Sequence, residues 1–175
     1  MLDAGCGGGD FSIGLDAAGY DVFGSDLSPT GIRHAQSLNV GKFVLSSIYD
    51  PLAVPFARET FDAIVSVEVI EHLYSPRGFA QNAMASLRPG GLLVVTTPYW
   101  GWLKKIVLAV TNRMDRSLTA LWEGGHIKHF SRKTLTELME TAGFETVAFR
   151  GCSEGQRRLF PFLWNGMAMA FRKRV

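Results

Sequence analysis

The sequence predicts an α/β fold in which helices flank a mostly parallel sheet. Short runs rich in Val, Ile and Phe alternate with stretches of helical spacing, which is typical of strands joined by crossover helices. In addition, the first apolar run is followed directly by a glycine-rich loop and then by a helical pattern. The chain has 175 residues, so we expect a single domain, 1–175.

Each predicted strand is a short apolar run bounded by polar or turn-forming residues. The seven candidate strands are 1–4, 21–25, 42–46, 62–67, 91–97, 145–150 and 166–171. The four candidate helices are 11–18, 29–38, 76–87 and 131–142. Ser28 ahead of Pro29 is a typical helix start, and so is Ser131 with Thr134 three positions later. Gly143 is a typical helix end.

A long segment, 99–130, interrupts this alternation and holds three of the four tryptophans. It is too long for a simple connection, so we expect a lid or a substrate-binding insertion. Its centre, Trp102–Val110, has the pattern of an amphipathic helix. Such a helix either packs on the sheet or makes peripheral contact with a membrane surface or an apolar acceptor.

The composition excludes several classes of protein. With 47% hydrophobic residues and a net charge of +2, the chain is neither disordered nor a dedicated nucleic-acid binder. Cys6 and Cys152 stand in unlike contexts and do not form a disulfide or metal-binding pattern. No apolar run approaches the roughly 18 residues of a membrane span, and no signal peptide precedes the first strand. We therefore expect a soluble, cytoplasmic protein.

The glycine-rich loop indicates a ligand that lies close to the backbone. Gly5, Gly7 and Gly9 follow the pattern G-x-G-x-G, and glycine permits a sharp turn and a close approach that a Cβ would prevent. Asp3, just ahead of the loop, favours a ligand with a cationic amine or sulfonium. A pyrophosphate prefers positive surroundings, so Asp3 and Asp10 disfavour a nucleotide-dependent oxidoreductase.

Asp26 ends the second predicted strand, 21 positions after Gly5. A carboxylate at this offset from a glycine loop is suited to accept hydrogen bonds from both hydroxyls of a ribose. The alternative is that Asp26 caps the following helix, a role for which Ser28 is better placed.

Five segments of the sequence together carry a family resemblance. They are 2–9 (Leu-Asp-Ala-Gly-Cys-Gly-Gly-Gly), 24–29, 61–73, 87–92 and 142–144. Together they make the chain similar, over nearly its whole length, to class I S-adenosylmethionine-dependent methyltransferases. Within that family, 68–72 (Glu-Val-Ile-Glu-His) and the following Ser75-Pro76 most resemble the O-methyltransferases of ubiquinone biosynthesis. The resemblance implies a Rossmann-like seven-stranded sheet of order 3-2-1-4-5-7-6, with the last strand antiparallel.

The resemblance also implies S-adenosylmethionine as cofactor and a small aromatic or lipid-like molecule as methyl acceptor. The predicted cofactor-binding residues are Asp3, Ala4, Gly5, Cys6, Gly7, Asp26, Leu27, Ser47, Ile48, Val67 and Glu68. Asp3 and the loop glycines would line the methionine portion, Asp26 the ribose and Leu27 the adenine. Ser47 stands where many relatives carry an acid near the adenine amino group. Val67 and Glu68 would border the sulfonium.

The chain begins two residues before Asp3, whereas family members usually carry a helix and more of the first strand there. We therefore expect a shortened first strand and a reduced affinity for the cofactor. This departure also keeps open an alternative function, a methyltransferase-like subunit that has lost catalysis and binds a partner.

Methyl transfer needs a base only when the acceptor is a hydroxyl or another acidic group, and histidine suits that task near neutral pH. His72 and His126 are the candidate catalytic residues. We expect His129 to bond a backbone carbonyl and His34 to lie on a solvated helix face.

A divalent cation on Glu68, Glu71 and His72 is an alternative suggested by the ubiquinone branch, although these residues equally suit a surface turn, and no metal is assigned. Cys6 has no histidine partner within sequence reach and is rejected as a nucleophile.

Overall fold

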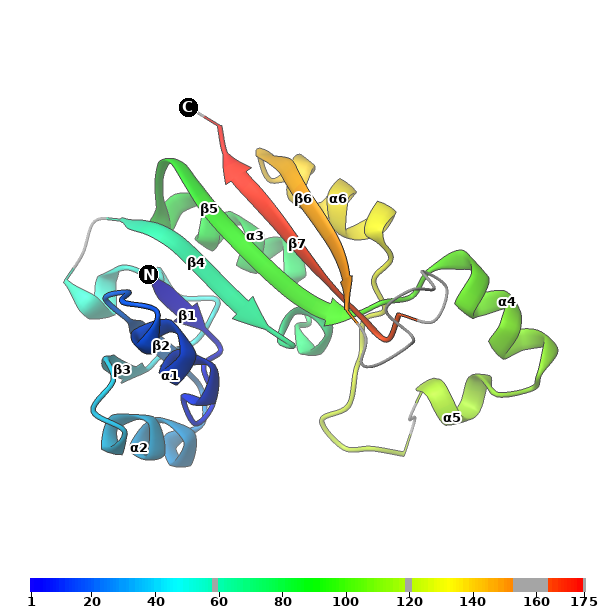
Figure 1. Cartoon of the computed structure of the whole chain (residues 1–175), viewed down its shortest axis with the longest axis horizontal. Coiled ribbons are helices and arrows are strands. Elements are labelled where there is room, and N and C mark those ends of the chain that lie inside the picture. The colour runs from blue at the N-terminus through cyan, green and yellow to red at the C-terminus, as the bar shows by residue number, and fades with distance from the viewer. Residues whose placement is uncertain (58–59, 119–120, 153–163, 175) are drawn as a thin grey trace.

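The computed structural model describes residues 1–57, 60–118, 121–152 and 164–174, in which seven strands form a single sheet (Figure 1). The strands are β1 (Leu2–Ala4), β2 (Phe23–Asp26), β3 (Lys42–Leu45), β4 (Phe61–Val67), β5 (Leu87–Pro98), β6 (Phe144–Cys152) and β7 (Gly166–Lys173). Their order is β3-β2-β1-β4-β5-β7-β6. β1 to β5 pair in parallel, whereas β7 is antiparallel to both β5 and β6, so the predicted topology is confirmed.

Helices connect the strands, and those at 10–17, 29–37, 76–86 and 132–141 match the four predicted helices. The helices are α1 (Asp10–Ala17), α2 (Pro29–Ser37), the short 3-10 turns η1 (Val54–Phe56) and η2 (Ile70–His72), α3 (Pro76–Ser86), α4 (Trp102–Val110), α5 (Met114–Leu118) and α6 (Arg132–Thr141). α3 and α6 lie together on one face of the sheet (Figure 1).

The helix ends follow the local sequence. Ser28 caps α2 by accepting a hydrogen bond from Gly31 N at 3.1 Å. Ser131 and Thr134 form a reciprocal capping box at the start of α6. Gly143, with φ 101°, adopts the left-handed conformation that ends this helix. All three predictions are confirmed.

β5 is longer than the predicted strand 91–97 because it continues backwards to Leu87, which pairs with Phe61 of β4. The register between the two strands shifts just after this pair. Such an irregularity interrupts the apolar alternation on which the strand prediction depends.

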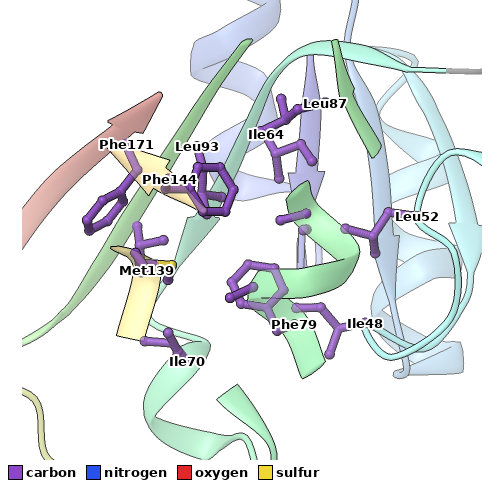
Figure 2. Close-up of a cluster of buried hydrophobic side chains, with 14 of the residues drawn as sticks. Ile48, Leu52, Ile64, Ile70, Phe79, Leu87, Leu93, Met139, Phe144 and Phe171 are labelled. Carbon is purple, nitrogen blue, oxygen red and sulfur yellow. The ribbon is translucent and has the colours of Figure 1, made fainter. Parts of the chain in front are cut away.

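The main hydrophobic core lies between the sheet and the two helices, α3 and α6, that cover one of its faces. Figure 2 shows Phe79 of α3 and Met139 of α6 directed toward the side chains of the sheet, among them Leu93 and Phe171. All four side chains are fully buried. Burying each of them stabilises the fold by about 1.5 to 3 kcal/mol, so this cluster holds the strand ends in a fixed arrangement.

The segment 99–130 leaves and rejoins the sheet at one point. Tyr99 and Phe130 form an isolated bridge, and Trp100 N donates to Phe130 O at 2.8 Å. Between them, α4 and α5 project beyond the end of β5 (Figure 1). α4 buries none of its residues, so of the two alternatives the helix packed on the sheet is wrong. Among the described residues, no helix is long and apolar enough to cross a bilayer.

Candidate functional site

The glycine loop folds over the ends of two neighbouring strands. Gly5 N and Cys6 N both donate to Ser25 O of β2, at 2.8 and 3.1 Å. A Cβ on Gly5 would lie 2.5 Å from Val69 Cγ2, so only glycine fits between the loop and the end of β4. A Cβ added to Gly7 (φ 52°) would instead have no other atom within 4 Å, so the space above the loop is open at this position.

Asp26 ties this loop to β2. Its Oδ2 accepts from Gly7 N at 2.9 Å, and its Oδ1 accepts from Ser28 N at 2.7 Å. A carboxylate has about four lone-pair positions, so each oxygen retains room for one further donor. Because Ser28 is the N-cap of α2, the alternative reading of Asp26 as that cap is wrong. The carboxylate is held in place by two backbone amides and can still accept a hydrogen bond from each of two hydroxyl groups.

Asp3 lies in β1, just ahead of the loop, and its carboxylate is directed toward α1. It is 1% exposed, and its Oδ2 accepts from Ser12 Oγ at 2.7 Å. Its Oδ1 is buried and has no hydrogen-bond partner among the described residues. Burial raises the pKa of Asp3 to about 6, partly offset by the Ser12 bond. Sequence reasoning missed Ser12. It is the buried residue of α1, whereas its apolar neighbours Phe11 and Ile13 are exposed, so the apolar pattern of the helix gave no signal for it.

The other predicted cofactor contacts differ in accessibility. Leu27, just after β2, is 64% exposed, as an apolar platform for a ring would be. Ser47 Oγ, just after β3, accepts from Tyr49 N at 3.1 Å. Ala4 and Ile48 are buried, so these residues can support the site through their backbone and packing rather than through an exposed side chain.

Cys6 is also buried and packs beside α2. Burial, followed by the nearby charges of Asp3 and Asp26, raises the pKa of its thiol to about 12. The reactive thiolate is therefore not formed near neutral pH, in agreement with the rejection of Cys6 as a nucleophile.

At the end of β4, Val67 is half-buried and Glu68 adopts a left-handed backbone conformation, with φ 54°. This conformation costs about 1 kcal/mol or more for a residue with a side chain. Thr96 of β5 holds it, since Thr96 Oγ1 donates to Glu68 Oε1 at 2.9 Å and Thr96 O accepts from Glu68 N at 3.2 Å. The chain consequently turns sharply from β4 into η2.

η2 meets the chain that returns from the insertion. The carbonyl of Glu71 accepts from both Ile127 N and Lys128 N, each at 2.9 Å. His72 Nδ1 lies 2.9 Å from Gly124 O, which fixes this nitrogen as a donor and leaves Nε2 as an acceptor. The rings of His72 and His126 are consequently 4.9 Å apart. The structure thus brings together the two histidines that the sequence singled out.

Both imidazoles line a cavity of about 330 Å³ whose other walls are largely apolar. Its remaining lining residues are Tyr74, Leu118, Trp122, Gly124, Gly125 and Ile127. This volume is at the lower end of small-molecule sites. A larger hollow, about 940 Å³, lies between α4 and α6, but none of the predicted cofactor or catalytic residues lines it.

Glu71 is the buried acid of this site. It is 1% exposed, and its Oε2 accepts from the hydroxyl of Thr97 at 3.0 Å. Its Oε1 has no hydrogen-bond partner among the described residues and lies 4.0 Å from His126 Nε2. Burial raises the pKa of Glu71 to about 7. Burial, followed by the proximity of His72, lowers the pKa of His126.

A metal could be held here, but by a different set of residues from the one considered in the sequence. Ligand atoms of Glu71, His72 and His126 all lie within 4.8 Å of one another. Glu68 instead directs its Oε1 to Thr96. Two imidazoles with one carboxylate suit a divalent transition metal, which would polarise an acceptor hydroxyl when bound.

Two other histidines differ from expectation. The ring of His129 packs on Trp100, with centroids 4.3 Å apart, and within the described chain it bonds no backbone carbonyl. The prediction for His129 is therefore wrong, because an aromatic neighbour from the insertion stem replaces the carbonyl. His34 is exposed as predicted, but its Nδ1 also lies 3.0 Å from Gly8 O and so contacts the glycine loop.

Comparison with known proteins matches this architecture to one family. A family model described as a methyltransferase domain matches residues 1–148. Ubiquinone biosynthesis O-methyltransferase of Methylobacterium nodulans is 38% identical over 155 residues, which cover 86% of this chain and 61% of that protein. The protein of the same name from Parvibaculum lavamentivorans is 37% identical over 101 residues, or 55% of this chain and 39% of that protein. The matched part thus spans about two fifths to three fifths of these relatives.

The solved structures agree on the fold. Magnesium protoporphyrin IX methyltransferase from Synechocystis, crystallised with bound SAH, superposes with a TM-score of 0.71 at 17% identity. The match covers 98% of this chain and 73% of that structure. At this identity the likeness concerns the arrangement of strands and helices alone.

Proposed function

Because the chain belongs to the class I S-adenosylmethionine-dependent methyltransferase family, we propose that it transfers the methyl group of S-adenosylmethionine to a hydroxyl oxygen of a small aromatic or lipid-like acceptor. The observation that carries this proposal is the arrangement of Asp26 and the glycine loop. Two backbone amides hold the carboxylate beside open space above Gly7. A ribose placed there would find an acceptor for each hydroxyl.

The remaining cofactor contacts follow from the same placement. Asp3 supplies negative charge beneath the methionine portion, and the exposed Leu27 offers a face for the adenine. Ser47 borders the adenine edge. Val67 and Glu68 lie beside the sulfonium at the end of β4. The positive sulfur then faces a pocket that carries carboxylates.

The chemistry asks little of the protein beyond alignment and removal of water. The leaving group is a neutral thioether and needs no acid, whereas an acceptor hydroxyl must lose a proton. His72 offers Nε2 for that proton, since its Nδ1 is held by Gly124 O. His126, 4.9 Å away, is the second candidate base. Burial lowers the pKa of His126, which favours the neutral form of the ring, the form that can accept a proton.

The acceptor class follows from the cavity beside the two histidines. Its apolar and aromatic walls suit a ring or an alkyl chain, and the imidazoles suit a hydroxyl. We assign residues 99–130 as the lid over this acceptor, within one domain of residues 1–175. Ubiquinone-type phenols fit this description, as the names of the relatives suggest for those proteins.

The proposal is tested by two measurements on the purified chain. Calorimetry should detect binding of S-adenosylmethionine and of S-adenosylhomocysteine. With 3,4-dihydroxybenzoate as a probe acceptor, S-adenosylhomocysteine should be released. Absence of cofactor binding would contradict the proposal. Binding without turnover on any phenol or catechol would favour the alternative, a methyltransferase-like subunit that binds a partner.

We also propose that α4 makes peripheral contact with a membrane surface. Trp102 and Val110 are 71% and 81% exposed, and Lys105 stands on the same helix. Apolar side chains next to a cation suit the interface of an anionic bilayer. Vesicles containing phosphatidylglycerol should sediment the chain, and the double variant Trp102→Ser, Val110→Ser should abolish this. Val54→Ser on η1, an apolar side chain that is 69% exposed, is the matched control. Both cysteines are free thiols, and we place the protein in the cytoplasm.

A further inference from the structure

The turn 47–50 follows β3 at the same edge of the sheet as the glycine loop. Ser46 N, just ahead of the turn, donates to Asp26 O at 3.1 Å, so the turn begins beside the residue to which we assign the ribose. Asp50 N donates to Ser47 O at 3.0 Å and closes the turn. An adenine attached to that ribose would have this turn as its neighbour.

One face of α3 holds the turn. Ser75, Gly78 and Asn82 follow one another at spacings of three and four residues, so they share a face of the helix and its N-cap. Ser75 N donates to the hydroxyl oxygen of Tyr49 at 3.1 Å. A Cβ on Gly78 would lie 3.7 Å from Tyr49 Cδ1, so the ring of Tyr49 packs over this glycine.

Asn82 makes the contact that fixes the backbone of the turn. Its Nδ2 donates to Ile48 O and to Asp50 O, both at 3.2 Å. Both hydrogens of the amide nitrogen are thus used, and an oxygen in its place would repel the two carbonyls. On the other side of the peptide between Ile48 and Tyr49, Tyr49 N donates to Ser47 Oγ at 3.1 Å. Both polar groups of this peptide are therefore held.

We propose that Asn82 is a positioning residue for the adenine base, because it holds the turn 47–50 in the shape that recognises this base. The proposal deepens the proposed methyl transfer and rests on its placement of the cofactor. Ser47 Oγ, which accepts one bond from Tyr49 N, retains a lone pair for a hydrogen of the adenine amino group. The side chain of Ile48 anchors the turn in the core cluster that also contains Phe79 of α3 (Figure 2).

The hold of Asn82 on the turn can be measured without a ligand. Asn82→Asp keeps the shape of the side chain but presents an oxygen to each carbonyl. Hydrogen–deuterium exchange at the amides of Tyr49 and Asp50 should become roughly tenfold faster in this variant, because both amides lie in the turn that is released. Gln81→Glu makes the same chemical change at the neighbouring, exposed position of α3 and should leave the exchange unchanged.

Unchanged exchange in Asn82→Asp overturns the proposal. Asn82→Ala removes the two donors without adding a charge, and it serves if Asn82→Asp does not fold. Its effect on the exchange should have the same direction.

The role in binding is tested by calorimetry with S-adenosylhomocysteine. Asn82→Asp should weaken the affinity roughly tenfold, as the loss of contacts to a displaced turn predicts. With 3,4-dihydroxybenzoate, the KM for S-adenosylmethionine should rise similarly, whereas kcat at saturating cofactor should stay within about twofold, since the reacting groups lie away from the base. An affinity equal to that of the parent chain overturns the proposal. A loss of kcat as large as the loss of affinity also overturns it, because Asn82 would then be structural.

A double-mutant cycle shows whether Asn82 acts through the turn. In a Ser47→Ala background, Asn82→Asp should weaken the affinity for S-adenosylhomocysteine much less than tenfold, since the contact that it positions is already gone. Full additivity of the two changes contradicts the proposal.

The outcomes separate this proposal from the function on which it rests. If the parent chain does not bind S-adenosylhomocysteine, the proposed function fails and the adenine role of Asn82 fails with it. If the parent chain binds and Asn82→Asp binds equally tightly, the proposed function stands and the role of Asn82 alone fails.

Discussion

Replacing Asp3 by Asn should change how the stability of the protein depends on pH. Burial raises the pKa of Asp3 from 3.8 to about 6 in the folded chain. The folded state therefore binds this proton more tightly than the unfolded state does. The contribution of Asp3 to stability is fully present below pH 3.8 and is lost as the pH rises through about 6.

The magnitude follows from the difference between these two values. At 1.36 kcal/mol for each pKa unit, the loss amounts to about 3 kcal/mol over the whole range, of which roughly 2 kcal/mol falls between pH 4.5 and 7.5. Asp3→Asn lacks the ionisation but retains an oxygen that can accept from Ser12 Oγ. The free energy of unfolding of the parent chain should therefore fall by about 2 kcal/mol relative to the variant across that interval.

Urea titrations of both chains at several pH values measure this difference. The comparison concerns the change with pH, so any constant effect of the amide on packing cancels. Asp16→Asn, on the exposed side of α1, is the control and should follow the parent chain. Parallel curves for Asp3→Asn and the parent chain would refute the reasoning, because Asp3 would then titrate alike in the folded and unfolded states.

Four further predictions, one of which compares two glycine variants, concern the site and the core. Asp26→Ala should weaken binding of S-adenosylmethionine by roughly 1 to 3 kcal/mol in calorimetry, since the ribose loses its charged acceptor. Undiminished affinity would show that the ribose lies elsewhere. Gly7→Ala should reduce cofactor affinity with a stability loss of only about 1 kcal/mol, because its Cβ would enter open space at φ 52°. Gly9→Ala should instead mainly lower the melting temperature, because its Cβ would lie 3.1 Å from Ala35 Cβ and 3.3 Å from Ala35 Cα, in addition to 2.9 Å from a Leu38 methyl group. Equal melting temperatures for the two variants would contradict this. His72→Ala should depress kcat by about 10²-fold or more without altering cofactor affinity, as expected for a base; equal losses in both would make His72 structural. Phe79→Ala should cost about 3 to 5 kcal/mol in urea unfolding because it empties a fully buried site, and a loss below about 1 kcal/mol would mean that the core refills.

Local rules account for most of what the sequence predicted correctly. The alternation of apolar runs and helices, together with the motifs of the family, led to the observed strand order. The caps at Ser28 and Ser131 depend on only three or four neighbouring residues and could be read directly. The placement of Asp26 beside the glycine loop follows from the adjacency of β1 and β2.

The features that were missed depend on contacts between distant segments. Glu71 meets the loop that contains His126 because its carbonyl accepts two amides more than 50 positions away, and nothing in either segment alone indicates this. The amphipathic pattern of α4 suits packing on the sheet as well as contact with another surface, yet α4 buries none of its residues. The ring of His129 packs on the ring of Trp100 instead of bonding the expected backbone carbonyl. In each case tertiary packing, which periodicity does not describe, decided the outcome.

The pairing of Tyr99 and Trp100 with Phe130 closes the insertion at its base, so the residues between these points could be exchanged as one unit. Because both of its ends are anchored to one spot, a loop of different length or composition could be grafted there without disturbing strand pairing in the framework. Exchange of this segment during evolution could thus change which molecule receives the methyl group, while the residues that bind the methyl donor stay the same. Chimeras exchanged at these two joints offer a direct route to altered selectivity.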